Sequence, residues 1–277
     1  MTGRLKIVLA TAVVIAGLTV VARRTSLRSF EQKTLNPGVL SDATPADVGI
    51  AFQRLSISSG PRRLDAFLVR ADAACPGATA VLIFHGRHET IGDWIRPQRL
   101  LHEACISSLV FDYSGHGWSS PPGTIEHLDD DAVAAYRAFV ETFPAAGRRC
   151  VLSHSLGSGP LLHGVTHVER QPDCVVLASP FSSLRDLAVM GGLPRPLRFI
   201  LPDVWDDVAA AARLDAPLLW IHSRADATIP LSLGARVYAV TNGPKRALTL
   251  EGYPHNAIYQ QLPPDLWNPV VAFLQGR

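Results

Sequence analysis

The pattern of apolar and polar residues changes once along this chain. Between Gly49 and Val69 the two kinds alternate on either side of Gly60-Pro61, which predicts an antiparallel hairpin. Further on, the apolar residues form short continuous runs, typical of strands that are buried on both faces of a parallel sheet. These runs are 80–84, 109–111, 150–152, 174–178, 218–221 and 247–250.

Segments with helical periodicity lie between most of these runs. In the clearest of them, 129–143, Ala132, Tyr136, Phe139 and Val140 fall on one stripe. The others are 98–104, 156–168, 231–240 and 266–274. Strands that alternate with helices are joined by right-handed crossovers. We therefore predict an α/β fold, in which the hairpin and six further strands form a mostly parallel, eight-stranded sheet flanked by helices.

The N-terminal residues have a different composition. Arg4 and Lys6 precede an uncharged run of 16 residues, 7–22, which two arginines close. This length lies between the core of a signal peptide and a full membrane span. We expect 1–24 to be a retained membrane anchor. The alternative is a signal segment that is cleaved from an exported, periplasmic or secreted protein, and the basic residues on both sides leave the topology open.

Three segments follow the N-terminal run. Turn-forming residues in 25–48 indicate a linker, and 49–277 has the length and apolar content of one globular domain. Within that domain, 181–213 interrupts the alternation of strands and helices with a glycine pair and several prolines. We expect this excursion to form a small cap over a pocket.

Charge and motifs exclude several classes of function. The net charge is +2 without basic runs, so nothing favours nucleic acid as a partner. The chain has no metal-ligand cluster, dinucleotide fingerprint or phosphate-binding loop, and we expect no metal and no cofactor. The composition leaves the oligomeric state open.

The four cysteines are compatible with export. Cys150 lies five residues before Ser155, and Cys174 lies five residues before Ser179, and both serines mark a strand end. The two cysteines can therefore lie side by side on neighbouring strands. We expect two buried, unpaired thiols there, because cysteine is among the most buried residue types. Whether these two pair, or Cys75 with Cys105, stays open.

The pentapeptide Ser153-His154-Ser155-Leu156-Gly157 stands between a predicted strand and a predicted helix. A small residue on each side of x-Ser-x in that position is the pattern of a nucleophile elbow. Ser155 is the expected nucleophile. Ser153 is the alternative, but it would require a small residue where Val151 stands.

The carboxyl ends of the other predicted strands carry an acid and a base in the order that this elbow requires. Asp226 follows the run 218–221, and His255 follows 247–250. A serine hydroxyl is a poor nucleophile until a base accepts its proton, and that base must be oriented by an acid. We expect His255 to be the base and Asp226 to orient it, while the N–H of Leu156 contributes to an oxyanion hole.

Six motifs in order resemble those of α/β-hydrolase-fold serine hydrolases over Gly49 to the C-terminus. They are His-Gly after the first buried strand, Asp-Tyr-x-Gly-x-Gly-x-Ser, His-Ser-Leu-Gly, Ser-Pro-Phe-Ser-Ser, Ile-His-x-x-x-Asp-x-x-x-Pro and Pro-His-Asn. The chain is similar to the lid-poor branch of that family, which includes monoacylglycerol-lipase-like, acyl-protein-thioesterase-like and dienelactone-hydrolase-like proteins.

The resemblance implies a function and further residue roles. It implies cleavage of a carboxylic ester or thioester through an acyl-enzyme, with the N–H of Arg87 as the second oxyanion donor. Acyl chains or lipids are a hypothesis for the small-molecule substrate. A serine aminopeptidase-like amide hydrolase is the alternative, and a non-catalytic binding protein is disfavoured because serine, acid and histidine are all present. Some family members carry the acid after the preceding strand, where Asp203, Asp206 and Asp207 stand.

Other residues of these motifs have structural interpretations. We expect His85, Asp112 and His116 to shape their loops and not to react. In the excursion, Met190, Leu193, Phe199 and Trp205 are candidates for the wall of an acyl pocket and equally for packing onto the core.

Overall fold

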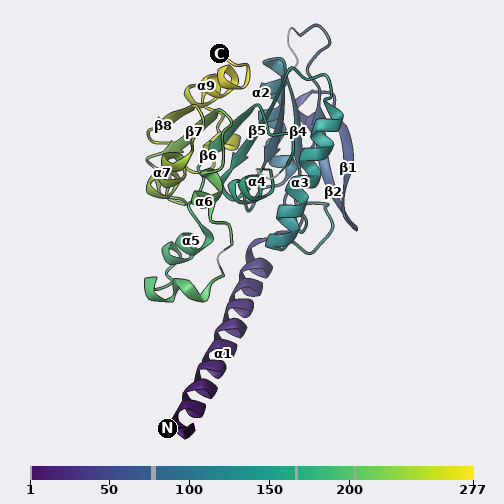
Figure 1. The fold of residues 1–277 in the computed structure, drawn as a ribbon. Helices are drawn as coiled ribbons and strands as arrows, with labels where there is room; N and C mark the ends of the chain where they lie inside the picture. Colours follow the sequence, from purple (N-terminus) through teal and green to yellow (C-terminus); the bar gives the residue numbers. More distant parts are fainter. Residues whose placement is uncertain (1, 76–78, 166–167, 203) are drawn as a thin grey trace.

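The computed structural model describes residues 2–75, 79–165, 168–202 and 204–277 (Figure 1). Its centre is one eight-stranded sheet with the strand order β1-β2-β4-β3-β5-β6-β7-β8. β2 runs antiparallel to both β1 and β4, and every other neighbouring pair is parallel. The strands are β1 (Gln53–Ser59), β2 (Arg62–Val69), β3 (Thr79–Phe84), β4 (Ile106–Phe111), β5 (Arg148–His154), β6 (Cys174–Ala178), β7 (Leu218–Ser223) and β8 (Lys245–Leu250).

Helices cover both faces of this sheet. One face carries α3 (Ile125–Thr142), α4 (Ser158–Gly164), α6 (Asp207–Ala211) and α7 (Leu231–Val240), and the other carries α2 (Ile95–Glu103), α8 (Ala257–Gln260) and α9 (Pro264–Leu274). Strand side chains alternate between the two cores: Leu82 and Phe84 of β3 lie in one, Val81 and Ile83 in the other. Continuous apolar runs are therefore needed in the central strands. The predicted α/β fold is confirmed.

The excursion after β6, called the cap below, interrupts the alternation of strands and helices. It contains α5 (Leu184–Met190) and the 3-10 helix η5 (Arg195–Ile200), and it returns to the core through α6. Figure 1 shows α5 below the sheet, on the side where the N-terminal helix leaves the domain. Three further 3-10 helices stand elsewhere in the described chain: η1 (Pro45–Val48), η2 (Ile91–Trp94) and η3 (Ser155–Gly157).

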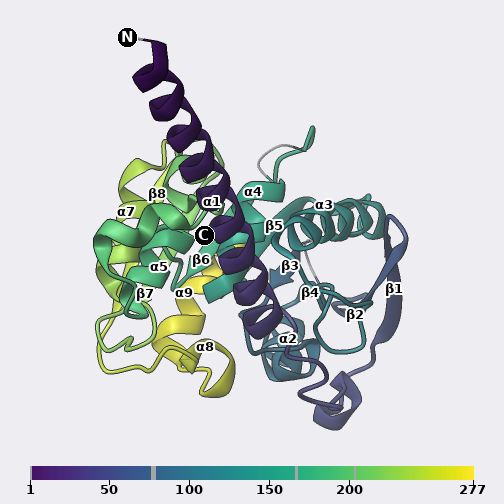
Figure 2. The same ribbon diagram turned by 90° about the horizontal axis from the view of Figure 1, so that it is seen from below.

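The N-terminal segment is the long helix α1 (Thr2–Thr34), which continues past residue 24 into the segment expected to be a linker. Its N-terminal part projects away from the domain, and its C-terminal end lies against it (Figures 1 and 2). There Leu27 and Phe30 pack against the core, and Leu35 is fully buried. Among the residues described, no helix combines the length and the apolar character needed to cross a bilayer, so the membrane anchor expected at 1–24 is not supported.

The cysteines form two disulfides, Cys75–Cys105 and Cys150–Cys174. The expectation of unpaired thiols at Cys150 and Cys174 is wrong. These residues are register partners on the parallel strands β5 and β6, with Cα atoms 4.6 Å apart, and both side chains point into the same core. This separation lies within the range that a disulfide can bridge.

We expect the Cys150–Cys174 disulfide to contribute to stability, because it closes a loop across 24 positions of the unfolded chain. Replacing both cysteines by alanine should lower the free energy of unfolding by about 3 kcal/mol. Urea denaturation followed by circular dichroism would measure this change. The matched control is the double replacement of Gln32 and Lys33, exposed residues of α1, by alanine, which should change it by less than about 0.5 kcal/mol. Equal stability of the two double variants would contradict the expectation.

Candidate active site

The turn after β5 places Ser155 in a conformation that few residues adopt. Ser155 has φ 53°, in the left-handed region, and it begins the 3-10 helix η3 that leads into α4. Gly157 makes the turn possible, because a Cβ there would lie 2.9 Å from the carbonyl oxygen of His85 and still closer to that of Phe84. The elbow is therefore packed directly on the end of β3. A non-glycine residue in this region stores of order 1 kcal/mol of strain, which is typical of functional sites.

The structure brings Ser155, His255 and Asp226 together in one hydrogen-bonded row. His255 Nε2 lies 2.8 Å from Ser155 Oγ, and His255 Nδ1 lies 2.7 Å from Asp226 Oδ2. The three residues come from the ends of β5, β8 and β7, respectively. Ser155 and His255 are 100 residues apart in the sequence, and the topology of the sheet brings them together.

Asp226 sets the hydrogen-bond roles of the imidazole. Its Oδ1 accepts the N–H groups of Thr228 at 2.9 Å and Ile229 at 2.8 Å. Burial alone would raise the pKa of Asp226, but the hydrogen bond and charge of His255 and the N–H of Ile229 lower that pKa to about 2. An ionised carboxylate can only accept, so Nδ1 of His255 must donate to it. In the neutral imidazole, Nε2 is then the acceptor for the Ser155 hydroxyl proton.

The alternative acids lie elsewhere. Asp206 caps the N-terminus of α6, where its Oδ1 accepts the N–H of Ala209. Asp207 is fully buried, accepts from Ser158 Oγ at 2.7 Å, and has a pKa that burial raises to about 6. Asp203 lies outside the described residues. Asp226 is therefore the carboxylate that contacts the His255 imidazole among the described candidates.

Arg87 and Leu156, the expected oxyanion donors, line the same cavity as Ser155. The loop that carries Arg87 is held by His116, whose Nε2 lies 3.0 Å from the Arg87 carbonyl oxygen. Burial and the neighbouring His85 lower the pKa of His116 to about 3, so its imidazole is neutral and Nε2–H donates to that carbonyl. His85 Nδ1 lies 2.8 Å from the Gly86 carbonyl oxygen.

Asp112 also acts on this loop. Its Oδ1 accepts the N–H of Ile91 at 2.9 Å and lies 3.3 Å from His85 Nε2. Neither His85 nor His116 contacts the Ser155 hydroxyl in the described structure, and both are fully buried. These contacts agree with loop-shaping roles for His85, Asp112 and His116.

Glu89 is a buried carboxylate that sequence reasoning did not single out. Its Oε1 lies 2.7 Å from His154 Nδ1, while its Oε2 accepts from the Gly86 N–H at 2.8 Å and from Trp94 Nε1 at 2.9 Å. Burial would raise the pKa of Glu89, but the charge and hydrogen bond of His154 lower it to about 2. The only signal in the sequence was an acid that stands four residues after His85, in the loop that follows a buried strand.

His154 is held as an imidazolium by two acceptors. One ring nitrogen faces the Glu89 carboxylate, and the other, Nε2, lies 3.0 Å from the main-chain carbonyl oxygen of His255. Neither partner can donate, so both ring nitrogens must carry protons. Although burial lowers the pKa of His154, Glu89 raises it above the ordinary value. A buried ion pair thus connects the loop of Gly86 and Arg87 to the backbone of His255.

The cavity above Ser155 has a volume of about 1120 Å³. Met190 and Leu193 of the cap line it. Phe199 does not line it and is half exposed, and Trp205 is buried in the core, where its Nε1 donates to Asp129 Oδ1 at 2.8 Å. Of the four candidates, two therefore line the cavity, one is packed in the core and one is half exposed.

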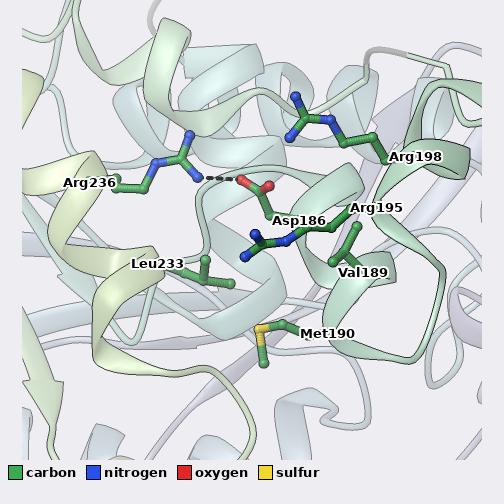
Figure 3. Close-up of a pocket in the computed structure, with 7 residues that line it drawn as sticks. All are labelled: Asp186, Val189, Met190, Arg195, Arg198, Leu233 and Arg236. Carbon is green, nitrogen blue, oxygen red and sulfur yellow. Dashed lines mark hydrogen bonds and ion pairs between the residues drawn. The ribbon is translucent and has the colours of Figure 1, made fainter.

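A second cavity, of about 370 Å³, lies on the other side of α5 (Figure 3). It contains no histidine or hydroxyl nucleophile among its lining residues, which are Asp186, Val189, Met190, Arg195, Arg198, Leu233 and Arg236. Within the described part of the chain, no group of three or more histidine, cysteine or acidic side chains is arranged to hold a metal ion.

Sequence comparison identifies one matching family and several relatives. The sequence model of a family described as "Serine aminopeptidase, S33" matches residues 76–207. An uncharacterised protein of Mycobacterium tuberculosis is 33% identical over 159 residues, which is 56% of this chain and 55% of that protein. Lysophosphatidylserine lipase ABHD12 of Danio rerio is 25% identical over 224 residues, 71% of this chain and 58% of the relative. The chain spans little more than half the length of these curated relatives.

Structural comparison shows the fold. An esterase of Pyrococcus furiosus superimposes with a TM-score of 0.69 at 21% identity, covering 86% of this chain and 97% of the esterase. The acylaminoacyl peptidase of Pyrococcus horikoshii gives a TM-score of 0.63 at 15% identity, covering 81% of this chain and 41% of the peptidase. The strand order and these structural neighbours show that the chain has the α/β-hydrolase fold.

Proposed function

We propose that this protein is a serine hydrolase that cleaves a carboxylic ester or thioester through an acyl-enzyme intermediate. The observation that carries the proposal is the row Ser155 Oγ–His255–Asp226, with distances of 2.8 and 2.7 Å, opening on a cavity of about 1120 Å³. Nucleophile, base and orienting acid in hydrogen-bond contact are the arrangement that acyl transfer requires.

The reaction follows from these contacts. His255 Nε2 accepts the Ser155 proton as Oγ attacks the carbonyl carbon, and Asp226 stabilises the imidazolium. The carbonyl oxygen becomes an oxyanion, to which the N–H groups of Arg87 and Leu156 donate. When the tetrahedral intermediate collapses, Nε2–H gives its proton to the leaving alcohol or thiol, and the acyl group stays on Oγ. Water, deprotonated by His255, then attacks the acyl-enzyme, releases the acid and restores the Ser155 hydroxyl.

The relatives support two kinds of scissile bond. An esterase and a lipase favour the ester, while the serine aminopeptidase description of the matching family and the acylaminoacyl peptidase favour an amide. The triad chemistry is shared by both. The apolar cap residues Met190 and Leu193, in the same cavity as Ser155, support an acyl chain as the bound group, and so the ester is the first proposal. The intact row argues against a non-catalytic binding protein.

We also propose that the enzyme works in an oxidising compartment outside the cytosol. Two disulfides, one of them between neighbouring strands of the central sheet, support this location, because disulfides are rare in cytosolic proteins. The apolar N-terminal run is in keeping with export.

Labelling with a fluorophosphonate probe tests the nucleophile. We expect the wild-type protein to be labelled and Ser155→Ala to be unlabelled, because the probe forms a covalent bond with an activated serine. The matched control is Ser153→Ala, two residues away, since Ser153 Oγ is buried without a hydrogen-bond partner among the described residues. It should label like the wild type. Labelling of Ser155→Ala would overturn the assignment. Absence of labelling in folded wild-type protein would overturn the proposed function.

The Glu89–His154 pair has a positioning role in this mechanism. His154 donates to the carbonyl oxygen of His255, and Glu89 accepts from the N–H of Gly86, next to the proposed oxyanion donor Arg87. Base and oxyanion loop are therefore fixed by one buried ion pair. Gly86 is required for it, because a Cβ there would collide with the Glu89 carboxylate and would lie 3.2 Å from His154 Nδ1.

Replacing Glu89 by Gln should lower kcat by about 10- to 100-fold with a smaller effect on KM, because small displacements of catalytic groups are costly. It should also lower the free energy of unfolding by about 3 kcal/mol, since a buried charge loses its partner. Steady-state kinetics on p-nitrophenyl esters and urea denaturation measure the two effects. The matched control is Glu103→Gln, which breaks an exposed pair with Arg99. An unchanged kcat in Glu89→Gln would exclude the positioning role.

The ion pair also predicts a dependence of stability on pH. Because the pKa of Glu89 is lowered to about 2 from an ordinary 4.5, its ionised form stabilises the folded state above about pH 4.5. This contribution is lost as the pH falls toward 2. The difference in unfolding free energy between wild type and Glu89→Gln should therefore shrink between about pH 5 and pH 2. Urea titrations at several pH values would show it, and a constant difference would contradict ionisation of Glu89.

A further inference from the structure

We propose that the C-terminal third of α1 forms one wall of the substrate site and binds the polar alcohol half of the substrate. The acyl half lies against the opposite, apolar wall made by α5. The substrate class is therefore an amphiphilic ester, with a hydrogen-bonding group attached through the ester oxygen. This inference rests on the proposed ester hydrolase function and names the part of the chain that selects the alcohol.

The end of α1 is held firmly by the domain. Asn36, just beyond the helix, accepts the N–H of Gly123 at 2.7 Å and donates to its carbonyl oxygen at 2.9 Å. Glu31 Oε1 accepts the N–H of Ile125 at the start of α3, at a distance of 3.0 Å. Leu35 is fully buried beneath this loop. The helix end is therefore a fixed part of the fold, as a binding wall must be.

Five side chains of α1 line the cavity that contains Ser155 and His255. They are Thr25, Ser26, Ser29, Phe30 and Thr34. Four of the five carry hydroxyl groups, and none of these hydroxyls has a hydrogen-bond partner among the described residues.

Thr34 is the deepest of these residues, with an exposed fraction of 9%. A hydroxyl that lines a cavity can exchange a water for a polar atom of a ligand, and each such hydrogen bond contributes about 0.5–1.5 kcal/mol. The wall is thus ready to bind polar atoms.

The opposite wall is apolar. Leu184, Leu187, Ala188 and Met190 of α5, together with Leu193, line the cavity on that side. Burial of a methylene group against such a surface is favourable by about 0.8 kcal/mol. α5 is held from its other side by the ion pair between Asp186 and Arg236 of α7, at 2.6 Å, which Figure 3 shows across the second cavity.

The two walls are connected to each other at their outer edge. Arg23 Nε of α1 donates to the carbonyl oxygen of Phe199 in η5 at 2.9 Å. The cavity between the walls, at about 1120 Å³, exceeds the range of about 300–1,000 Å³ of most small-molecule sites. It has room for both halves of an ester whose carbonyl carbon lies at Ser155.

A pair of octanoyl esters tests the inference. One is p-nitrophenyl octanoate, and the other is 1-octanoylglycerol, whose alcohol has two free hydroxyls. The variant is Ser29→Ala with Thr34→Val, which removes two hydroxyls and keeps the shape nearly unchanged. We expect KM for 1-octanoylglycerol to rise by about tenfold, the effect of losing one to two hydrogen bonds, while kcat/KM for the p-nitrophenyl ester changes less than twofold.

The control is Gln32→Ala, an exposed residue of α1 that does not line the cavity, and it should leave both esters unaffected. The melting temperature of each variant reports on folding. If the wild type hydrolyses both esters and the double variant retains its KM for 1-octanoylglycerol, the inference alone is overturned. Hydrolysis of the p-nitrophenyl ester without the glycerol ester also overturns it alone. Hydrolysis of neither ester by folded wild type overturns the proposed function together with it.

Discussion

The contact between Gly157 and the last carbonyl groups of β3 is the constraint on which the site depends. Without a Cβ, residue 157 packs directly on the carbonyl groups of Phe84 and His85, and the turn can hold Ser155 at φ 53°. The same contact fixes the start of the loop that carries Arg87. Ser155 and the loop of Arg87 are therefore placed by one main-chain packing arrangement, in an interior that is closely packed.

A buried ion pair completes this arrangement. The buried pair of Glu89 and His154 lies behind Ser155 and bonds to the main chain on both sides, at Gly86 and at His255. Since each acceptor and donor of the pair is satisfied, its desolvation is compensated and its geometry is specific. The Asp226 carboxylate likewise bonds both to the main chain, at Thr228 and Ile229, and to the His255 imidazole. His255 is thus held at its ring by the Asp226 carboxylate and at its main-chain carbonyl by His154.

The strands and the row Ser155, Asp226 and His255 were predictable because they depend on local patterns and on one rule of topology. Apolar runs identify buried strands, and the carboxyl ends of parallel strands meet at one edge. Glu89 could not be assigned, because its role depends on contact with His154, 65 positions away. The sequence could not show that Met190 and Leu193 line the cavity while Phe199 and Trp205 do not. All four are apolar, and their positions depend on how the cap folds.

The helix α1 shows why a local pattern can mislead. Its apolar run was interpreted through length and flanking charge, which say nothing of the residues that follow. Those residues, Thr25 to Thr34, continue the helix and present hydroxyls and Phe30 to the cavity, while Glu31 and Asn36 bind the loop before α3. The turn-forming residues that indicated a linker, Asn36-Pro37-Gly38 and Thr44-Pro45, all stand after the end of this helix. A segment that leaves the domain on one side therefore closes its active-site cavity on the other.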